Sequence, residues 1–235
     1  MRYRGLGVGI VTYNRPECLE RCLASIYSSG LRVPVVVMHT GASYGDPSIT
    51  ERCMTEDGLL VRHHFVRNLL PWARHVAETE LSQLGCRRFL ITDDDVMLDG
   101  RKVALMARLS SRELPTIFGG GLRTSWRSPG MASDLSYLAW LGSDDPVPGG
   151  RTVPVGSVYS MLYRGLWSDV VELGIKFTCE DLAWCYLAHK RGATFKRLGF
   201  VGLHAPPTEP SGYPEAPNVW QSFLEACRKY GAPYA

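Results

Sequence analysis

Three consecutive aspartates, Asp93, Asp94 and Asp95, are the first candidates for chemistry in this chain. They directly follow the apolar run at residues 89–91, which is typical of a buried strand. Adjacent carboxylates repel one another by about 1 kcal/mol or more even at high effective dielectric, and a bound cation relieves that repulsion. Carboxylate oxygens suit Mg²⁺ or Mn²⁺, and side chains two residues apart on an extended backbone point the same way. The cluster predicts a divalent-metal site at Asp93 and Asp95, with a solvated, helix-capping loop as the alternative.

Two further acidic side chains and one histidine are candidates elsewhere. Glu180 and Asp181 stand at the start of the helical pattern at residues 180–191, where the helix dipole favours carboxylates. The same position suits a general base, which needs a rigidly held, exposed carboxylate. His204 ends the strand-like run at residues 195–203 and is either a third metal ligand or a structural histidine.

The elements that must position these residues alternate between two periods. Three apolar runs predict buried strands at residues 8–11, 33–38 and 89–91, and the pieces 59–61 and 64–66 suggest a further strand whose ends the pattern does not define. Apolar residues at helical spacing predict three helices, at residues 16–30, at residues 71–85 and after Asp99. The first two lie between predicted strands, and the third follows the last of them. This alternation predicts a single α/β domain with a mainly parallel sheet and flanking helices. Ligands of such sheets bind beyond the carboxyl ends of the strands, which is where the aspartates fall.

Local signals suggest how the helices begin and which faces they bury. Asn14 is expected to cap the first helix, with Pro16 in its first turn. The second helix is expected to carry four apolar side chains inward, namely Trp72, Val76, Leu81 and Leu84. Asp99 is expected to cap the third helix.

The second half of the chain is less regular. Strands are expected at residues 116–118 and 158–163, and a last helix at residues 218–231. Residues 122–154 are rich in Gly, Pro, Ser and aromatics without a firm period, and a long irregular stretch inside a compact domain is usually functional.

Composition excludes several classes of protein. The 235 residues are 45% hydrophobic and 21% charged, which argues against disorder, and the net charge of +3 does not by itself imply nucleic acid or an anionic membrane. No apolar run approaches the ~20 residues of a transmembrane helix, and no signal peptide is recognisable. Seven cysteines without metal-type pairs, including Cys18 and Cys22 one helical turn apart, are expected to be reduced thiols. These features predict a cytoplasmic protein.

Four segments together resemble the GT-A glycosyltransferases, most closely the large inverting family that includes many bacterial sugar transferases. The matching segments are residues 10–16, residues 68–74, the aspartate motif at 89–95, and 180–184 with Arg191 and Gly192 downstream. The order and spacing of the segments, over about residues 6 to 204, carry the resemblance. It implies the GT-A variant of the Rossmann-like fold and transfer of a sugar from a nucleotide-sugar donor, expected to be UDP-linked, to a hydroxyl acceptor.

The resemblance also implies roles for individual residues. Asp95, with Asp93, is expected to bind Mn²⁺ or Mg²⁺ on the donor diphosphate, and His204 to complete the metal site. Asp181 is expected to deprotonate the acceptor and so invert the anomeric centre. The remaining candidates bind the nucleotide: Thr12, Tyr13, Asn14 and Arg15 around the nucleoside, Arg74 near base or phosphate, and Asp94 at the ribose.

The resemblance divides the domain into three parts. Residues 1–110 form the nucleotide-sugar half, 111–205 the acceptor-side half and 206–235 a C-terminal loop and helix. The usual base-reading aspartate after the second strand is missing, because Met38, His39 and Thr40 stand there.

The acceptor stays open between a glycan and a modified nucleic-acid base, the latter permitted by Arg123, Trp126 and Arg127. The alternative functions are a sugar-phosphate nucleotidyltransferase and a degenerate GT-A domain that binds a glycan or nucleotide without turnover.

Overall fold

The computed structural model describes residues 5–40, 50–54, 60–66, 70–109, 116–119, 121–123, 153–155, 166–172, 184, 194–197 and 202–204. The predicted strand at 158–163 and the helix at 218–231 lie outside these residues, as does all of the predicted helix at 180–191 except Trp184.

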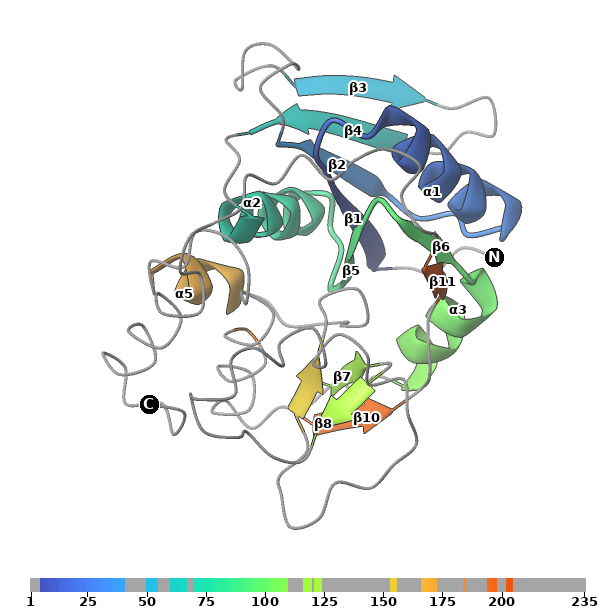
Figure 1. Ribbon diagram of the computed structural model, residues 1–235, viewed down its shortest axis with the longest axis vertical. Coiled ribbons are helices and arrows are strands. Elements are labelled where there is room, and N and C mark those ends of the chain that lie inside the picture. The colour runs from blue at the N-terminus through green and yellow to red at the C-terminus, as the bar shows by residue number, and fades with distance from the viewer. Residues whose placement is uncertain are drawn as a thin grey trace, which may run out of the picture.

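Five strands form the main sheet, in the order β3-β4-β2-β1-β5 (Figure 1). Their bounds are β1 Leu6–Thr12, β2 Val35–His39, β3 Thr50–Met54, β4 Leu60–Phe65 and β5 Arg88–Asp93. Four of these strands are parallel, whereas β3 pairs antiparallel with β4 at the edge. The predicted α/β fold with a mainly parallel sheet is therefore confirmed, although the edge strand β3 was not predicted.

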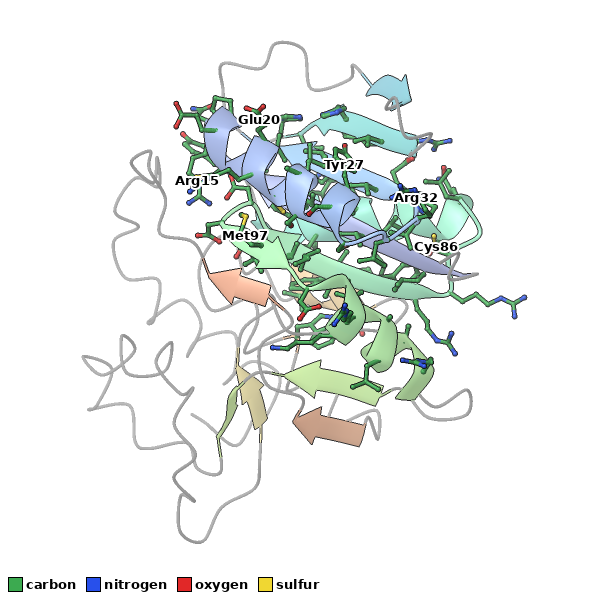
Figure 2. All side chains as sticks on the ribbon, turned by 90° about the vertical axis from the view of Figure 1, so that its right-hand side faces the viewer. Arg15, Glu20, Tyr27, Arg32, Cys86 and Met97 are labelled. Atoms are coloured by element: carbon green, nitrogen blue, oxygen red, sulfur yellow. The ribbon has the colours of Figure 1, made fainter. Side chains whose placement is uncertain are left out.

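Helices cover both faces of this sheet. Helices α1 (Pro16–Ser28) and α3 (Gly100–Leu109) pack on one face, through a buried cluster that includes Ile10, Cys22 and Val103. Helix α2 (Leu70–Gln83) packs on the other. Figure 2 shows α1 lying along the sheet, with Arg15 at its N-terminal end.

The inward face of α2 differs from the prediction at Trp72 alone among the four residues named, because Leu81 is buried and Val76 and Leu84 pack against the same cluster. Trp72 is 43% exposed, whereas Ala73, Ala77 and Leu81 are buried at a spacing of four residues. The reason is the opposing strand β1, whose Gly7 and Gly9 have no side chains to hold the helix away. A Cβ on Gly9 would stand 2.6 Å from Ile91 Cδ1 and 3.2 Å from Ala77 Cβ. Small residues on both sides allow α2 to approach the sheet closely.

Three short strand pairs lie outside the main sheet. Strand β6 (Val96–Leu98) pairs antiparallel with β11 (Gly202–His204), and β7 (Thr116–Gly119) pairs parallel with β10 (Thr194–Arg197). Strand β8 (Gly121–Arg123) pairs with β9 (Val153–Val155). The strand-like run predicted at residues 195–203 forms two short strands, β10 and β11, and the strand predicted at 116–118 is confirmed.

Other expectations are settled by the same elements. Helix α5 (Leu166–Glu172) and strand β6 were not predicted. Asp99 caps α3, since its Oδ1 accepts a hydrogen bond from the amide of Arg101 at 2.9 Å. Cys18 and Cys22 are buried thiols outside any disulfide, as expected. Within the described segments, no helix combines the length and the apolar character needed to cross a bilayer.

Candidate functional site

The loop between β1 and α1 makes a left-handed turn at the edge of the sheet. Asn14 has φ 49°, a conformation that asparagine tolerates better than most residues, and its side chain is exposed. Arg15, not Asn14, is the residue before the helix, and it makes no side-chain cap. The predicted Asn14 cap is therefore wrong. Because Arg15 precedes Pro16 it is restricted to non-helical backbone, and its side chain extends to the aspartates instead of closing the helix.

Thr12 joins the ends of two neighbouring strands. Its carbonyl oxygen accepts two hydrogen bonds from Thr40, one from the amide and one from the hydroxyl, each at 3.0 Å. Thr40 directly follows β2, so these bonds fix the carboxyl ends of β1 and β2 relative to each other. Tyr13, which follows Thr12 in the chain, is half-buried at the same carboxyl end of the sheet.

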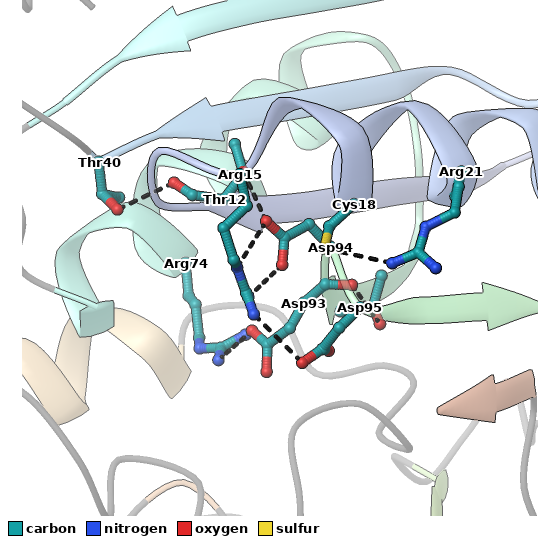
Figure 3. A network of polar contacts seen from close by, with 10 residues as sticks. Thr12, Arg15, Cys18, Arg21, Thr40, Arg74, Asp93, Asp94 and Asp95 are labelled. Carbon is teal, nitrogen blue, oxygen red and sulfur yellow. Dashed lines mark hydrogen bonds and ion pairs between the residues drawn. The ribbon is translucent and has the colours of Figure 1, made fainter. Parts of the chain in front are cut away.

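Asp94 is wholly buried and accepts hydrogen bonds on both carboxylate oxygens (Figure 3). The Thr12 hydroxyl donates to Oδ2 at 2.6 Å, and Arg15 donates from Nε to Oδ2 at 3.2 Å and from Nη2 to Oδ1. A carboxyl group that only accepts is ionised. In this arrangement Asp94 anchors the β1–α1 loop and offers no surface to the ribose that the resemblance implied.

Burial acts on the pKa of Asp94 in the opposite direction to its two hydrogen-bonding partners, whereas the charges of Asp93 and Asp95 act in the same direction as burial. Burial raises the pKa of Asp94 to about 7, against the Thr12 hydrogen bond and the Arg15 charge, which both lower it. Burial also lowers the pKa of Arg15, but the facing carboxylates outweigh it and the net direction is upward. The guanidinium therefore stays charged, and its fork on Asp94 favours the ionised carboxylate against the effect of burial.

The two outer aspartates each face one arginine. Arg74 Nη2 lies 2.8 Å from Asp93 Oδ1, and Arg15 Nη1 lies 3.5 Å from Asp95 Oδ2. Two guanidinium groups thus face three carboxylates, and one formal negative charge remains when all are ionised. The repulsion that predicted a cation is largely relieved by side chains of the chain itself, so the cluster alone does not require a metal.

The outer carboxylates are nevertheless the accessible ones. The side chain of Asp93 is 33% exposed and that of Asp95 is 14% exposed, whereas Asp94 is sealed. The predicted extended backbone through the cluster is wrong, because β5 ends at Asp93 and the next two residues form a turn. Asp95 Oδ1 is itself buried, so Asp93 is the more open of the two. Two outer carboxylates with residual negative charge are a donor set that would fit Mg²⁺ or Mn²⁺, and their pairing on a metal stays a prediction.

A buried aromatic stack stands behind Arg74, whose side chain is 2% exposed. Its guanidinium carbon lies 5.5 Å from the ring centroid of Trp167 on α5, and the Trp167 ring stacks on Trp184 at 5.9 Å. Both tryptophans are 3% exposed. The stack joins Asp93 to the segment that follows Glu180 and Asp181 in sequence. Sequence analysis did not find it, since nothing in the spacing of Trp167 and Trp184 marks them as neighbours.

The remaining candidate residues are placed only in part. His204 pairs with Val96 in the β11–β6 ladder, so its backbone lies beside the residue that follows Asp95. Its side chain, and Asp181 altogether, lie outside what the structure describes. Among the described residues, no three His, Cys, Asp or Glu side chains are grouped as a complete protein-built metal site would need.

A histidine pair occupies the end of β2, where the base-reading aspartate was missing. His39 Nε2 lies 2.9 Å from His63 Nδ1, with ring centroids 5.2 Å apart and the planes nearly parallel. Burial, together with the His63 charge, lowers the pKa of His39 to about 4. His39 is therefore neutral at physiological pH. The pairing could have been suspected only once the β2–β4 register was known.

Comparison with known proteins gives structural likeness alone: no family model and no curated protein matches the chain. A mannosyltransferase from Pyrobaculum calidifontis, PcManGT in complex with GDP-Man and Mn²⁺, is 17% identical, with a TM-score of 0.49 over 96% of this chain and 65% of that one. The crystal structure of 4-diphosphocytidyl-2C-methyl-D-erythritol synthase is 12% identical, with a TM-score of 0.49 over 95% of this chain and 98% of that one.

TarS of S. aureus is similar to the same degree. Its 1-349 fragment is 14% identical, with a TM-score of 0.47 over 95% of this chain. The chain spans 63% of that fragment and 38% of a longer TarS structure. At these identities and TM-scores, the likenesses transfer no activity and no ligand.

Proposed function

We propose that this chain is a metal-dependent inverting glycosyltransferase. It would move a sugar from a nucleotide sugar, with UDP as the first choice, to a hydroxyl of an acceptor, with a glycan as the first choice. The observation that carries the proposal is the edge formed by the carboxyl ends of β1, β2 and β5. There, two outer carboxylates, the open Asp93 and the mostly buried Asp95, lie next to a loop fixed by a wholly buried third, Asp94.

The β1–α1 loop supports the donor side of this proposal. Tyr13 and Asn14 lie at the carboxyl edge of the sheet, where open α/β sheets bind their ligands. Thr12 contributes mainly by fixing the loop, because its hydroxyl is used on Asp94 and its carbonyl on Thr40. In this role the loop would line the nucleoside. Arg15 and Arg74 would lie near the diphosphate, with both guanidinium groups already paired with the aspartates.

Asp93 and Asp95 would hold the divalent metal, with His204 as a further proposed ligand. When bound, Mn²⁺ or Mg²⁺ supplies a Lewis acid that neutralises the charge developing on the departing diphosphate. Arg74 holds Asp93 in place, and Asp94 holds Arg15. Asp181 is the proposed base: it would take the acceptor's proton as the hydroxyl attacks the anomeric carbon from the face opposite the leaving group.

A thermal-shift panel of nucleotide sugars with and without MnCl₂ tests the proposal. A donor at about 100 times its Kd stabilises the native state by about 2.7 kcal/mol, so the true donor stands out. Incubation of that donor with glycan acceptors should then release a nucleoside diphosphate. A parallel incubation with a nucleoside triphosphate and a sugar phosphate tests the alternative, because release of inorganic pyrophosphate from that mixture would identify a nucleotidyltransferase instead. Binding of a donor or glycan without any product would identify a binding domain.

A further inference from the structure

Arg15 Nη1 lies next to Asp95, a carboxylate that a bound metal would also need. Nε and Nη2 form a fork on the buried carboxylate of Asp94, and Nη1 extends beyond it to Asp95 Oδ2 at 3.5 Å. Asp95 is thus shared between the guanidinium and any cation that binds the accessible carboxylates.

Arg15 cannot easily move aside to admit that cation. Its departure would leave the buried Asp94 carboxylate, among the residues that the structure describes, with the Thr12 hydroxyl alone, and an uncompensated buried charge is strongly unfavourable. The fork also fixes the plane of the guanidinium and therefore the direction of Nη1. Arg15 is a fixed positive charge beside Asp95.

We infer that Arg15 is a built-in competitor of the divalent metal, which lowers the affinity of Asp95 for Mn²⁺ until a donor diphosphate binds. The inference rests on the proposed function. A diphosphate is negatively charged and is attracted by both the guanidinium and the metal, so its arrival removes the conflict between them. Metal and nucleotide then strengthen each other's binding, and reciprocity requires the same factor for both.

The test removes the competing charge without changing the net charge of the cluster. The double variant Arg15→Gln with Asp94→Asn deletes one positive and one negative charge and keeps hydrogen-bonding groups at both positions. A second version, Arg15→Met with Asp94→Leu, makes the same charge change with apolar side chains, which buried ion pairs often tolerate. The matched control is Arg62→Gln with Glu80→Gln, which deletes a 3.1 Å ion pair between β4 and α2.

The readout is the binding of Mn²⁺ itself, followed by electron paramagnetic resonance of the free ion, with and without UDP or GDP. Without nucleotide, either Arg15–Asp94 variant should bind Mn²⁺ about tenfold more tightly than wild type, which corresponds to about 1.4 kcal/mol of relieved repulsion. The factor by which UDP or GDP strengthens Mn²⁺ binding should fall correspondingly. The control should match wild type in both measurements.

Three outcomes would overturn the inference. Unchanged or weaker Mn²⁺ binding by both folded variants would show that Arg15 does not compete. An equal gain in the Arg62–Glu80 control would show a general charge effect. A wild-type protein that binds no Mn²⁺ even with UDP or GDP would overturn the proposed function as well, whereas in the first two outcomes a wild type that binds Mn²⁺ with nucleotide leaves that proposal standing.

Discussion

Arg74 and Asp93 form an ion pair in which the cation is hidden and the anion is open. The guanidinium is 2% exposed and donates at 2.8 Å to a carboxylate that is 33% exposed. Behind the guanidinium stands the face of Trp167, and cation–π contacts strengthen when they are shielded from water. The position of Asp93 therefore depends on the packing of α2 against α5.

Arg74→Lys is expected to destabilise the fold by about 1–2 kcal/mol, because an ammonium cannot keep both the planar stack and the hydrogen bond. Urea unfolding followed by circular dichroism measures the loss. A double-mutant cycle with Trp167→Phe should give a coupling of about 0.5–2 kcal/mol between the two positions. Additive losses would mean that the ring contact contributes nothing.

Thr12→Val is expected to cost about 1.5–3 kcal/mol, the usual range for a hydrogen bond to a charged group. The change keeps the shape but removes the only hydroxyl on Asp94 among the described residues. Denaturant unfolding of Thr79→Val is the matched control, because the Thr79 hydroxyl donates only to His75 O on an exposed turn of α2. Similar losses in both variants would argue against a special role for the buried bond.

Gly9→Ala is expected to cost about 1–3 kcal/mol through overpacking. The new Cβ would stand 2.6 Å from Ile91 Cδ1, so Ile91→Val, which removes that methyl group, should restore part of the loss. The combined variant should be more stable than the sum of the single changes predicts. Strict additivity in thermal unfolding would locate the strain elsewhere, for instance against Ala77.

His39 should make the protein sensitive to acid. Its pKa is about 4 in the fold, against about 6.5 when unfolded. Between these values the unfolded state binds more protons, so the stability is fully present above about pH 6.5 and is lost as pH falls towards 4.

His39→Gln should therefore lose about 2 kcal/mol less than wild type between pH 7.5 and 5. Free energies of unfolding at the two pH values provide the measurement, and an NMR titration should find the wild-type imidazole still neutral at pH 5. An equal loss in both proteins would show that other groups set the acid limit.

Asp181→Asn tests the proposed base. Turnover of the donor identified above should fall by about 10²–10⁴, while donor and Mn²⁺ affinities stay near wild type. Glu180→Gln is the control, because adjacent residues on a helix point about 100° apart and only one of them can face the sugar. A product with retained configuration would defeat the assignment, whatever the rates.

The parallel sheet was predictable because β1, β2 and β5 are mostly apolar runs, which signal burial on both faces, and the helices between them keep a clear period. Strand β4 is interrupted by Arg62, His63 and His64 and gave a weaker signal. Strand β3 was not predictable in this way, since Thr50, Glu51 and Arg52 belong to an edge strand that needs no apolar run. The exposed Trp72 was mispredicted because the inward face of α2 is set by the glycines of the opposing strand, not by its own largest side chains.

In the candidate site, too, local sequence patterns predicted some features, whereas others depend on contacts between distant residues. Carboxylates at a strand end are a local signal, and the sequence located them. That Asp94 is sealed while Asp93 and Asp95 are open depends on Arg15 and Arg74, which reach the cluster from loops and helices distant in the chain. Contacts between side chains distant in the chain leave no pattern in the local sequence. The stack of Trp167 on Trp184 could not be predicted for the same reason.

The β6–β11 ladder has a consequence for how the molecule forms. It joins Val96 to His204, whereas the main sheet is complete once β5 has been made. Contacts between distant segments carry a large loop-closure cost and slow folding. On the ribosome, β1 to β5 can assemble before β11, which pairs with β6 beside the aspartate turn, has been synthesised. A nascent chain ending shortly after α3 should therefore already resist protease across the main sheet, yet acquire the neighbour of Val96 only near the end of translation.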